Sequence, residues 1–325
     1  MPARYTVTDL GTLGGAGSRA YAINSAGVVA GEAETAGRRI HAFIWRPGQG
    51  MSDLGTLGGP TSRAYDINSN GTVVGEADTT SGLREAFVWS EAAGMTNLGG
   101  ALRPFASFAY AISDEDFIVG GADSEDGSQA VVWSNGIPRM PRLDPSGISV
   151  AYDINAAGYI AGQVDRGEPD NRVSAAFIHR PTEPSTSLLP RPGGLSSSAR
   201  AMNDLNQATG YLETTNGETH AFVFDGVRGL RDIDTMSNAF SSANAINDSG
   251  QVVGVFFHLR DDDEHAFVSV AGTMHDLNAL IRTGKTDWVL IEAQDINDAG
   301  QIVGYGMAGE RERAFLLTPV RENDK

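Results

Sequence analysis

The chain has 325 residues, a formal net charge of −17 and no cysteine. The lack of cysteine excludes disulfide bonds, thiolate metal sites and cysteine nucleophiles, and the acidic balance disfavours nucleic acid, whose phosphates need a basic surface. No apolar run approaches membrane-spanning length and no signal peptide precedes the first predicted strand, so the sequence predicts a soluble cytoplasmic protein, or an exported one if a signal has been removed.

The first predicted element is a strand over residues 5–10, and a repeated phrase follows it seven times. The phrase reads Ala-x-x-Ile-Asn-x-x-Gly-x-Val-x-Gly, with Ala-Phe further on. Its Ile position falls at residues 23, 67, 112, 154, 202, 246 and 296, so successive copies lie 44, 45, 42, 48, 44 and 50 residues apart. A period in the forties is typical of β-propeller blades.

Each copy predicts four short strands joined by turns, and the second copy is the clearest. Its strands are expected over residues 63–67, 72–75, 86–89 and 95–98. The first two are joined by a turn with Asn68 and Gly71, which suits a tight hairpin, and the strands are rich in β-branched and aromatic residues. The Asn of the repeated Ile-Asn pair is therefore interpreted as turn chemistry.

The seventh copy lacks a fourth strand, and the N-terminus supplies a matching one. Residues 5–10 resemble the fourth-strand phrase near residues 51–55, so the N-terminal strand should complete the last blade and close the ring. The sequence thus predicts one all-β domain over residues 1–325, a seven-bladed β-propeller with four antiparallel strands in each blade. The blade-defining repeats lie near 19–57, 63–98, 108–143, 150–189, 199–233, 243–277 and 292–318, with the closing strand at 5–10.

The repeats also carry a family resemblance. Residues 9–15 and 53–59 read Asp-Leu-Gly-Thr-Leu-Gly-Gly, and residues 41–43, 220–222 and 265–267 read His-Ala-Phe. This combination resembles the bacterial HAF repeat, which implies a bacterial repeat protein, often described as extracellular, without a family-wide catalytic signature. Glu85, Gln129, Ala175 and Arg313 replace the His in other copies, so that His is not a ligand or catalyst in every blade.

The first strand of each blade is expected to line the central channel, where three ring positions are of interest. One position carries Asp66, Asp153 and Asp295 among alanines; its neighbour carries Tyr21, Tyr65, Tyr110, Tyr152, Arg200, Asn244 and Gln294; a third, on the second strand, includes Glu32, Glu76, Tyr211 and Tyr305. Carboxylates near apolar walls can act as general acids or bases. We interpret Asp66, Asp153, Asp295, Glu32 and Glu76 as candidate catalytic groups, and Tyr21, Tyr65, Tyr110, Tyr152, Arg200, Tyr211, Tyr305 and Trp288 as candidate ligand-binding groups. In the alternative interpretation, the three aspartates only accept hydrogen bonds inside the ring.

Three irregular segments depart from the repeat. Residues 277–292 form the longest connection between blades, with Arg282, Lys285, Asp287 and Trp288, and are interpreted as a lid over the channel or as a packed surface insertion. Residues 164–174 and 258–265 are rich in carboxylates, so calcium is a hypothesis for either loop, although neither matches an EF-hand. Zinc held by His258, His265 and an acidic partner is a further hypothesis. No cofactor and no specific metal site are predicted.

Two functions remain open, because propellers host both. In the first, the loop-rich face and channel mouth bind a small molecule, a carbohydrate or a protein. In the second, the same mouth encloses the substrate of a lyase, cyclase or hydrolase whose carboxylates transfer protons. The sequence contains no Gly-x-Ser-x-Gly elbow, Walker loop or zincin motif. Binding is the preferred interpretation, by a monomer that engages neither nucleic acid nor membrane.

Overall fold

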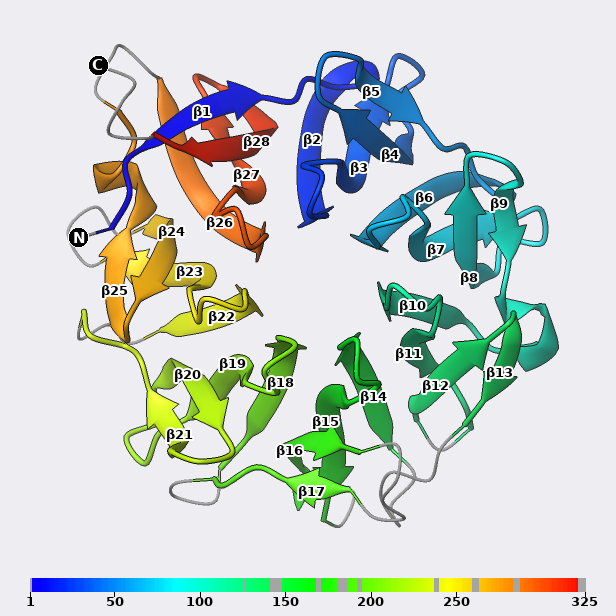
Figure 1. Cartoon of the computed structure of the whole chain (residues 1–325). Coiled ribbons are helices and arrows are strands. Elements are labelled where there is room, and N and C mark those ends of the chain that lie inside the picture. Colours follow the sequence, from blue (N-terminus) through cyan, green and yellow to red (C-terminus); the bar gives the residue numbers. More distant parts are fainter. Residues whose placement is uncertain are drawn as a thin grey trace.

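The computed structural model describes residues 2–125, 127–140, 148–167, 171–180, 186–191, 195–236, 240–258, 263–282 and 287–320. These residues form seven four-stranded antiparallel sheets that stand around a central axis (Figure 1). The predicted seven-bladed β-propeller is therefore confirmed. In each blade the first strand of the repeat is innermost, and the chain passes outward strand by strand before it crosses to the next blade.

The blades are numbered from the first complete copy. Blade 1 contains β2 (Gly14–Ile23), β3 (Val29–Thr35), β4 (Ile40–Arg46) and β5 (Gly50–Asp53); blade 2 contains β6 (Gly58–Ile67), β7 (Val73–Thr79), β8 (Arg84–Ser90) and β9 (Gly94–Asn97); blade 3 contains β10 (Ser107–Ile112), β11 (Ile118–Ala122), β12 (Gln129–Ser134) and β13 (Ile137–Arg139). Blade 4 contains β14 (Ser149–Ile154), β15 (Ile160–Arg166), β16 (Val173–His179) and β17 (Ser187–Leu188); blade 5 contains β18 (Ser197–Met202), β19 (Ala208–Glu213), β20 (Thr219–Asp225) and β21 (Gly229–Asp232). Blade 6 contains β22 (Ser241–Ile246), β23 (Val252–His258), β24 (Asp263–Val270) and β25 (Thr273–Asp276); blade 7 contains β26 (Trp288–Ile296), β27 (Ile302–Ala308), β28 (Arg311–Pro319) and β1 (Tyr5–Asp9). The 3-10 helices η1 (Gly99–Leu102) and η3 (Leu277–Ala279) lie between blades.

The two ends of the chain meet in blade 7. Strand β1 pairs antiparallel with β28, from Tyr5 opposite Pro319 to Asp9 opposite Phe315. The N-terminal strand therefore supplies the outer strand that the seventh copy lacks, and Figure 1 shows β1 (blue) beside β28 (red). Since this pairing joins residues from opposite ends of the sequence, it closes the ring and covers an edge that would otherwise be open.

The Ala-Phe and Val-x-Gly parts of the repeat pack against each other inside each blade. Phe43 of β4 is fully buried, and its ring lies under Gly31 of β3. A Cβ placed on Gly31 would lie 2.1 Å from the carbonyl oxygen of Arg19 and 2.8 Å from the Phe43 ring. The glycine thus lets the innermost strand and the phenylalanine approach the same point, and equivalent contacts surround Gly75, Gly162, Gly254 and Gly304.

Every innermost strand is interrupted by a bulge near its end. In β6 the register shifts between Ala64 and Asp66, so Tyr65 is the extra residue, and the same shift occurs in the other six blades. A bulge lets two successive side chains approach the same face of a strand. For this reason Tyr65 and Asp66 both line the channel instead of alternating between its two sides.

The repeated Asn has a role between blades that the sequence analysis did not foresee. As expected for turn chemistry, the Asn24 carboxamide oxygen accepts hydrogen bonds from the Ala26 and Val28 amides. Its Nδ2 also donates to the backbone oxygen of Asn68 in blade 2, 3.0 Å away. Corresponding donations run from Asn68, Asn155, Asn203, Asn247 and Asn297 to the next blade. Blade 3 carries Ser113 at this position, and within the described parts of the chain its side chain makes no corresponding bond to blade 4.

The Ser113→Asn variant should therefore complete this ring of hydrogen bonds. An added intramolecular hydrogen bond contributes about 1 kcal/mol, so the free energy of unfolding in urea is expected to rise by roughly that amount. Ser113 already accepts the turn amides of Glu115 and Phe117, as an Asn would. The Ser25→Asn variant, changed in an exposed turn next to the ring position, is the control. Equal stability of Ser113→Asn and the unchanged protein would argue against the proposed contribution.

Candidate functional site

The channel contains a cavity of about 200 Å³ at the level of the bulges. It is open along the channel axis and is bounded by side chains from all seven innermost strands. Its lining consists of Tyr21, Ala22, Tyr65, Asp66, Tyr110, Ala111, Tyr152, Asp153, Arg200, Ala201, Asn244, Ala245, Gln294 and Asp295. The structure thus brings together the two ring positions that the sequence singled out.

Four tyrosines form an arc over blades 1 to 4. The ring centroids of Tyr21, Tyr65, Tyr110 and Tyr152 are separated in turn by 5.8, 5.5 and 5.6 Å. The Arg200 guanidinium continues the arc in blade 5, 5.3 Å from the Tyr152 centroid, and also lies 5.5 Å from that of Tyr211.

Burial raises the pKa of all four phenols in the arc, so they remain protonated at neutral pH and can donate hydrogen bonds. On the opposite side of the channel the same ring position carries Asn244 and Gln294. The channel therefore has one aromatic side and one amide side.

Each of the three channel aspartates binds two backbone amides. Asp66 accepts the amide of Ile67 in its own blade at 2.7 Å and that of Ile112 in blade 3 at 2.8 Å. Asp153 likewise joins blades 4 and 5, and Asp295 joins blades 7 and 1. Three aspartates thus serve six blades in pairs, and blade 6 is left over because the number of blades is odd.

The charge state of these carboxyls depends on two opposing effects. Burial raises the pKa of Asp66 to about 8, of Asp153 to about 7 and of Asp295 to about 6, while the two amide donors on each act in the opposite direction. The negative charges of Asp153 and Asp295 further raise the pKa of Asp66. The hydrogen bonds agree with the interpretation that the aspartates only accept hydrogen bonds inside the ring. The raised pKa values agree with a role in proton transfer. The catalytic assignment therefore stays a prediction.

Glu32 and Glu76 lie next to the arc, in ion pairs with one arginine. Arg63 contacts Glu32 at 2.6 Å and Glu76 at 3.0 Å, and Arg84 adds a contact to Glu76. Tyr305 donates to Glu292 at 2.6 Å, and its ring lies 4.3 Å from the Arg19 guanidinium, which is paired with Glu312. Neither Glu32 nor Glu76 lines the cavity.

The arginines and the additional glutamates of this layer were not predicted from the sequence. The signal was available, because Arg19 and Arg63 stand two residues before the arc tyrosines of their strands, and Glu292 occupies the corresponding place in blade 7. A comparison of that ring position would have found them.

Trp288 is not part of the channel site. It lies at the start of β26, where its ring packs edge-on against Phe315 at a centroid distance of 6.2 Å. The preceding connection packs between blades, since Leu277, Leu280 and Ile281 are buried in the same apolar cluster as Tyr5. These described parts of the expected lid lie toward the outside of the ring (Figure 1). Lys285 is outside the described residues, as are Glu168 and Asp170 of the first carboxylate-rich loop.

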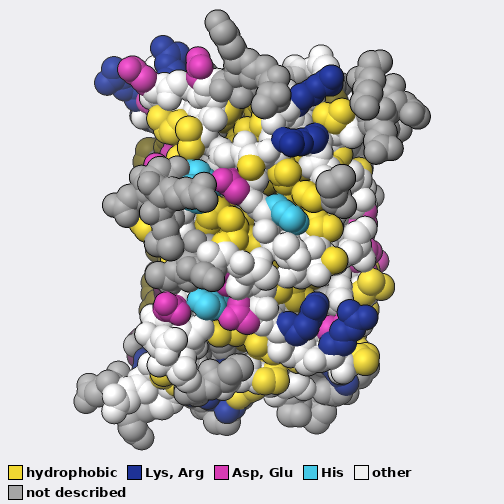
Figure 2. Space-filling model, turned by 90° about the vertical axis from the view of Figure 1, so that its left-hand side faces the viewer, with side chains coloured by type: hydrophobic (Ala, Val, Ile, Leu, Met, Phe, Trp, Pro, Cys, Tyr) yellow, Lys and Arg dark blue, Asp and Glu magenta, His cyan; other side chains and the backbone are white. Residues whose placement is uncertain are grey.

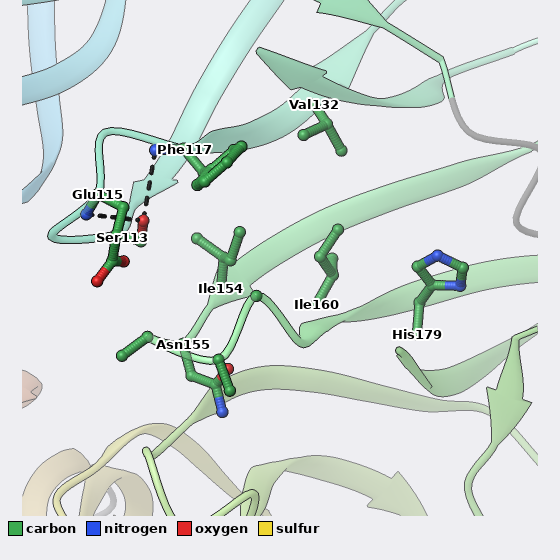
Figure 3. Close-up of a pocket in the computed structure, with 11 residues that line it drawn as sticks. Ser113, Glu115, Phe117, Val132, Ile154, Asn155, Ile160 and His179 are labelled. Carbon is green, nitrogen blue, oxygen red and sulfur yellow. Dashed lines mark hydrogen bonds between the residues drawn. The ribbon is translucent and has the colours of Figure 1, made fainter. Parts of the chain in front are cut away.

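A larger cavity, of about 340 Å³, lies between blades 3 and 4. Figure 3 shows Phe117, Val132, Ile154 and Ile160 turned toward this space, with His179 at one end. This cavity was not predicted from the sequence, in which the Phe117 position varies and carries Val, Thr, Tyr or Gln in the other blades. Because its walls are mainly apolar and it holds few converging polar groups, the channel remains the better candidate site despite its smaller volume.

The His of the His-Ala-Phe phrase has a recurrent structural partner. Nδ1 of His41 lies 2.9 Å from Asp53, that of His220 lies 2.6 Å from Asp232, and that of His265 lies 3.1 Å from Asp276. Each aspartate belongs to the fourth strand and also accepts an amide two residues on. In these three blades the His therefore holds the outer strand through an aspartate of that strand. Only in blade 6, among the described residues, does the pair join a group with metal-ligand geometry, through His258.

Comparisons with known proteins establish the fold and leave the family open. No protein-family model matches the chain, and no curated protein matches it. Virginiamycin B lyase from Staphylococcus aureus is similar in structure, with a TM-score of 0.55, 9% identity and coverage of 98% of this chain and 100% of the lyase. A gluconolactonase from Xanthomonas campestris has a TM-score of 0.48 at 10% identity, covering 98% of this chain and 97% of its own. The BP39L lectin from Burkholderia pseudomallei has a TM-score of 0.46 at 12% identity, covering 98% of both chains. Among the described residues no helix is long and apolar enough to cross a membrane.

Proposed function

We propose that this protein is an HAF-repeat propeller that binds a small polar molecule, of the size and chemistry of a monosaccharide, in its central channel. One observation carries the proposal. At a single channel position, four successive blades present tyrosine, whereas the other three present Arg200, Asn244 and Gln294. Construction of the blades does not require two chemically different sides of the channel, so this division into an aromatic and a polar side favours recognition of a ligand.

The chemistry of the lining suits a polyol. Phenol, amide and guanidinium groups offer hydrogen-bond donors and acceptors to hydroxyls, and the aromatic arc offers an apolar face. The cavity of about 200 Å³ is smaller than the roughly 300–1,000 Å³ of pockets that enclose drug-sized ligands, which suits a ligand as small as a monosaccharide.

Catalysis is the second candidate, and the pKa values of the aspartates favour it. Carboxyls with a pKa near 7, such as Asp153 and Asp66, can exchange protons at neutral pH. The propeller with a TM-score of 0.55 to this chain is a lyase by name, so the fold accommodates such an activity. Against it stands the engagement of each carboxylate by two backbone amides.

Titration with glucose, galactose and their uronic acids, followed by saturation-transfer NMR, tests the proposal. We expect at least one to bind, and the Arg200→Ala variant to lose affinity by about 10-fold or more, since charged hydrogen bonds contribute roughly 1.5–3 kcal/mol. Arg231→Ala, which removes an exposed arginine from the outer strand of the same blade, is the matched control. Equal binding by the two variants, or no binding by any of these sugars, would refute it; conversion of the sugar, lost in Asp153→Asn, would favour the enzyme.

A further inference from the structure

We propose that blade 6 carries a site for one divalent transition-metal ion of the zinc class, formed by His258 of β23, His265 of β24 and Asp276 of β25. The site lies in the outer part of the blade, away from the channel, and is independent of the function proposed above. On the side of the molecule seen in Figure 2, which holds blade 6 and the N-terminal strand, histidine side chains lie beside acidic ones.

The three side chains converge because their strands are neighbours. His265 lies opposite Phe256 in the ladder, which places His258 diagonally across from it on the same face, and Asp276 follows diagonally on the next strand. One potential ligand atom from each residue lies within 4.8 Å of the other two. Zinc bound to two atoms in tetrahedral geometry holds them roughly 3.4 Å apart, so small side-chain rotations suffice to form the site.

Packing holds the two imidazoles close together. Their rings are stacked with centroids 4.6 Å apart and an angle of 4° between planes. The fully buried Phe256 meets both edge-on, at 5.9 Å from His258 and 6.0 Å from His265. His265 is itself buried, with 7% of its surface exposed. Such support reduces the entropy that the ligands lose when a metal binds.

The chemistry of the group matches borderline metal ions. Neutral imidazole nitrogens bind zinc, copper, nickel and iron, and a carboxylate oxygen is a common additional ligand. With three protein ligands, the ion would keep a coordination position for water. Asp263, opposite His258 in the ladder, adds negative charge nearby.

Comparison of the blades shows that His258 is the exceptional member. The His–Asp pair occurs in blades 1, 5 and 6, so it builds the blade. The place of His258, two residues beyond the partner of the paired His, is occupied by Thr35 in blade 1 and Thr214 in blade 5. Both threonines accept an amide of the following turn. The fold is satisfied by threonine at this place in blades 1 and 5, so the second histidine is particular to blade 6, where it completes the group of three potential ligands.

Calorimetric titration of the tag-free, chelator-treated protein with Zn²⁺ tests this site. We expect one equivalent to bind and to raise the melting temperature, and Co²⁺ in its place to give the visible absorption of a low-symmetry site. The His258→Thr variant, which restores the residue of blades 1 and 5, should fold and should lose affinity by about 10- to 100-fold or more. Asp276→Asn, measured separately, should also weaken binding.

The matched control is His220→Gln, which removes a His–Asp pair in blade 5 where no second histidine is present. It should bind Zn²⁺ as the unchanged protein does. The proposal is overturned if no single equivalent binds, or if His258→Thr and Asp276→Asn both bind with unchanged affinity.

Discussion

The Asp66→Asn variant is expected to gain about 3 kcal/mol in unfolding free energy relative to the unchanged protein as the pH rises from 5 to 8. Asparagine imitates the protonated carboxyl in shape but cannot ionise. The Asp66 carboxylate accepts hydrogen bonds from the Ile67 and Ile112 amides at the same time, and asparagine can still accept one of the two. The difference between the two proteins therefore isolates the free energy of ionising this one group inside the ring.

The direction follows from the raised pKa. Asp66 titrates near pH 8 in the folded protein, against an ordinary value of 3.8. Between these values the folded chain holds a proton that the unfolded chain releases, so the contribution of this group to stability is complete below about pH 4 and declines as the pH rises toward 8. One such proton corresponds to roughly 1.4 kcal/mol per pH unit, and water in the open channel reduces the total.

Urea denaturation at pH 5, 6, 7 and 8 measures this difference, with Glu310→Gln, an exposed carboxyl, as the control for general charge effects. The opposite slope, in which the unchanged protein gains stability over Asp66→Asn with rising pH, would mean that the amide donors outweigh burial. The carboxyl would then be ionised at neutral pH and could not act as a general acid there. The measurement therefore bears on the catalytic alternative as well as on stability.

The fold was predictable because each blade of the propeller is encoded by one copy of the same sequence repeat. The spacing of the Ile-Asn pairs defined the blades, and the likeness of residues 5–10 to a fourth strand predicted the β1–β28 pairing between opposite ends of the chain. The period also predicted that Asp66 and Tyr65 face the channel, although a regular strand would have placed them on opposite sides. The bulge that brings both to the channel leaves no mark in the sequence apart from the repeat itself.

Contacts between blades were less accessible to sequence reasoning. The donation from Asn24 to Asn68 joins residues 44 positions apart, and the Arg63 pair with Glu32 joins blades 1 and 2. Such contacts depend on the angle and spacing of neighbouring sheets, which no single repeat encodes. For His265 an acidic partner was proposed from the sequence but not identified, because its pairing with Asp276 depends on the register between the third and fourth strands.

The Gly120→Ala variant is expected to lose about 3 kcal/mol or more in unfolding free energy, although the substitution adds only one methyl group. A Cβ on Gly120 would lie 1.9 Å from the carbonyl oxygen of Phe108 and 2.9 Å from its carbonyl carbon. Both atoms belong to the backbone of β10, so relief requires a shift of the innermost strand and of the bulge that positions Tyr110.

The adjacent glycine provides the matched control. A Cβ on Gly121 would meet its nearest neighbours, the Gln129 oxygen and a Val150 methyl, at 3.7 and 3.8 Å, which is ordinary contact. Gly121→Ala should therefore be neutral or stabilising by about 0.4–1 kcal/mol, because alanine restricts the unfolded chain. Other blades already carry Glu32, Glu76 or Tyr305 at the position of Gly121, whereas these blades all keep glycine at the position of Gly120.

Urea denaturation of the two variants compares neighbouring positions in one strand, with the same substitution and the same change in propensity. A large loss of unfolding free energy in Gly120→Ala alone would show why the repeated Val-x-Gly requires its glycine. The reason would be the close approach of the first two strands, and not a general need for glycine in β11. Equal effects at both positions would refute this explanation. The same close approach fixes the innermost strands against the rest of each blade, so its loss should also disorder the tyrosine arc on which the proposed binding site depends.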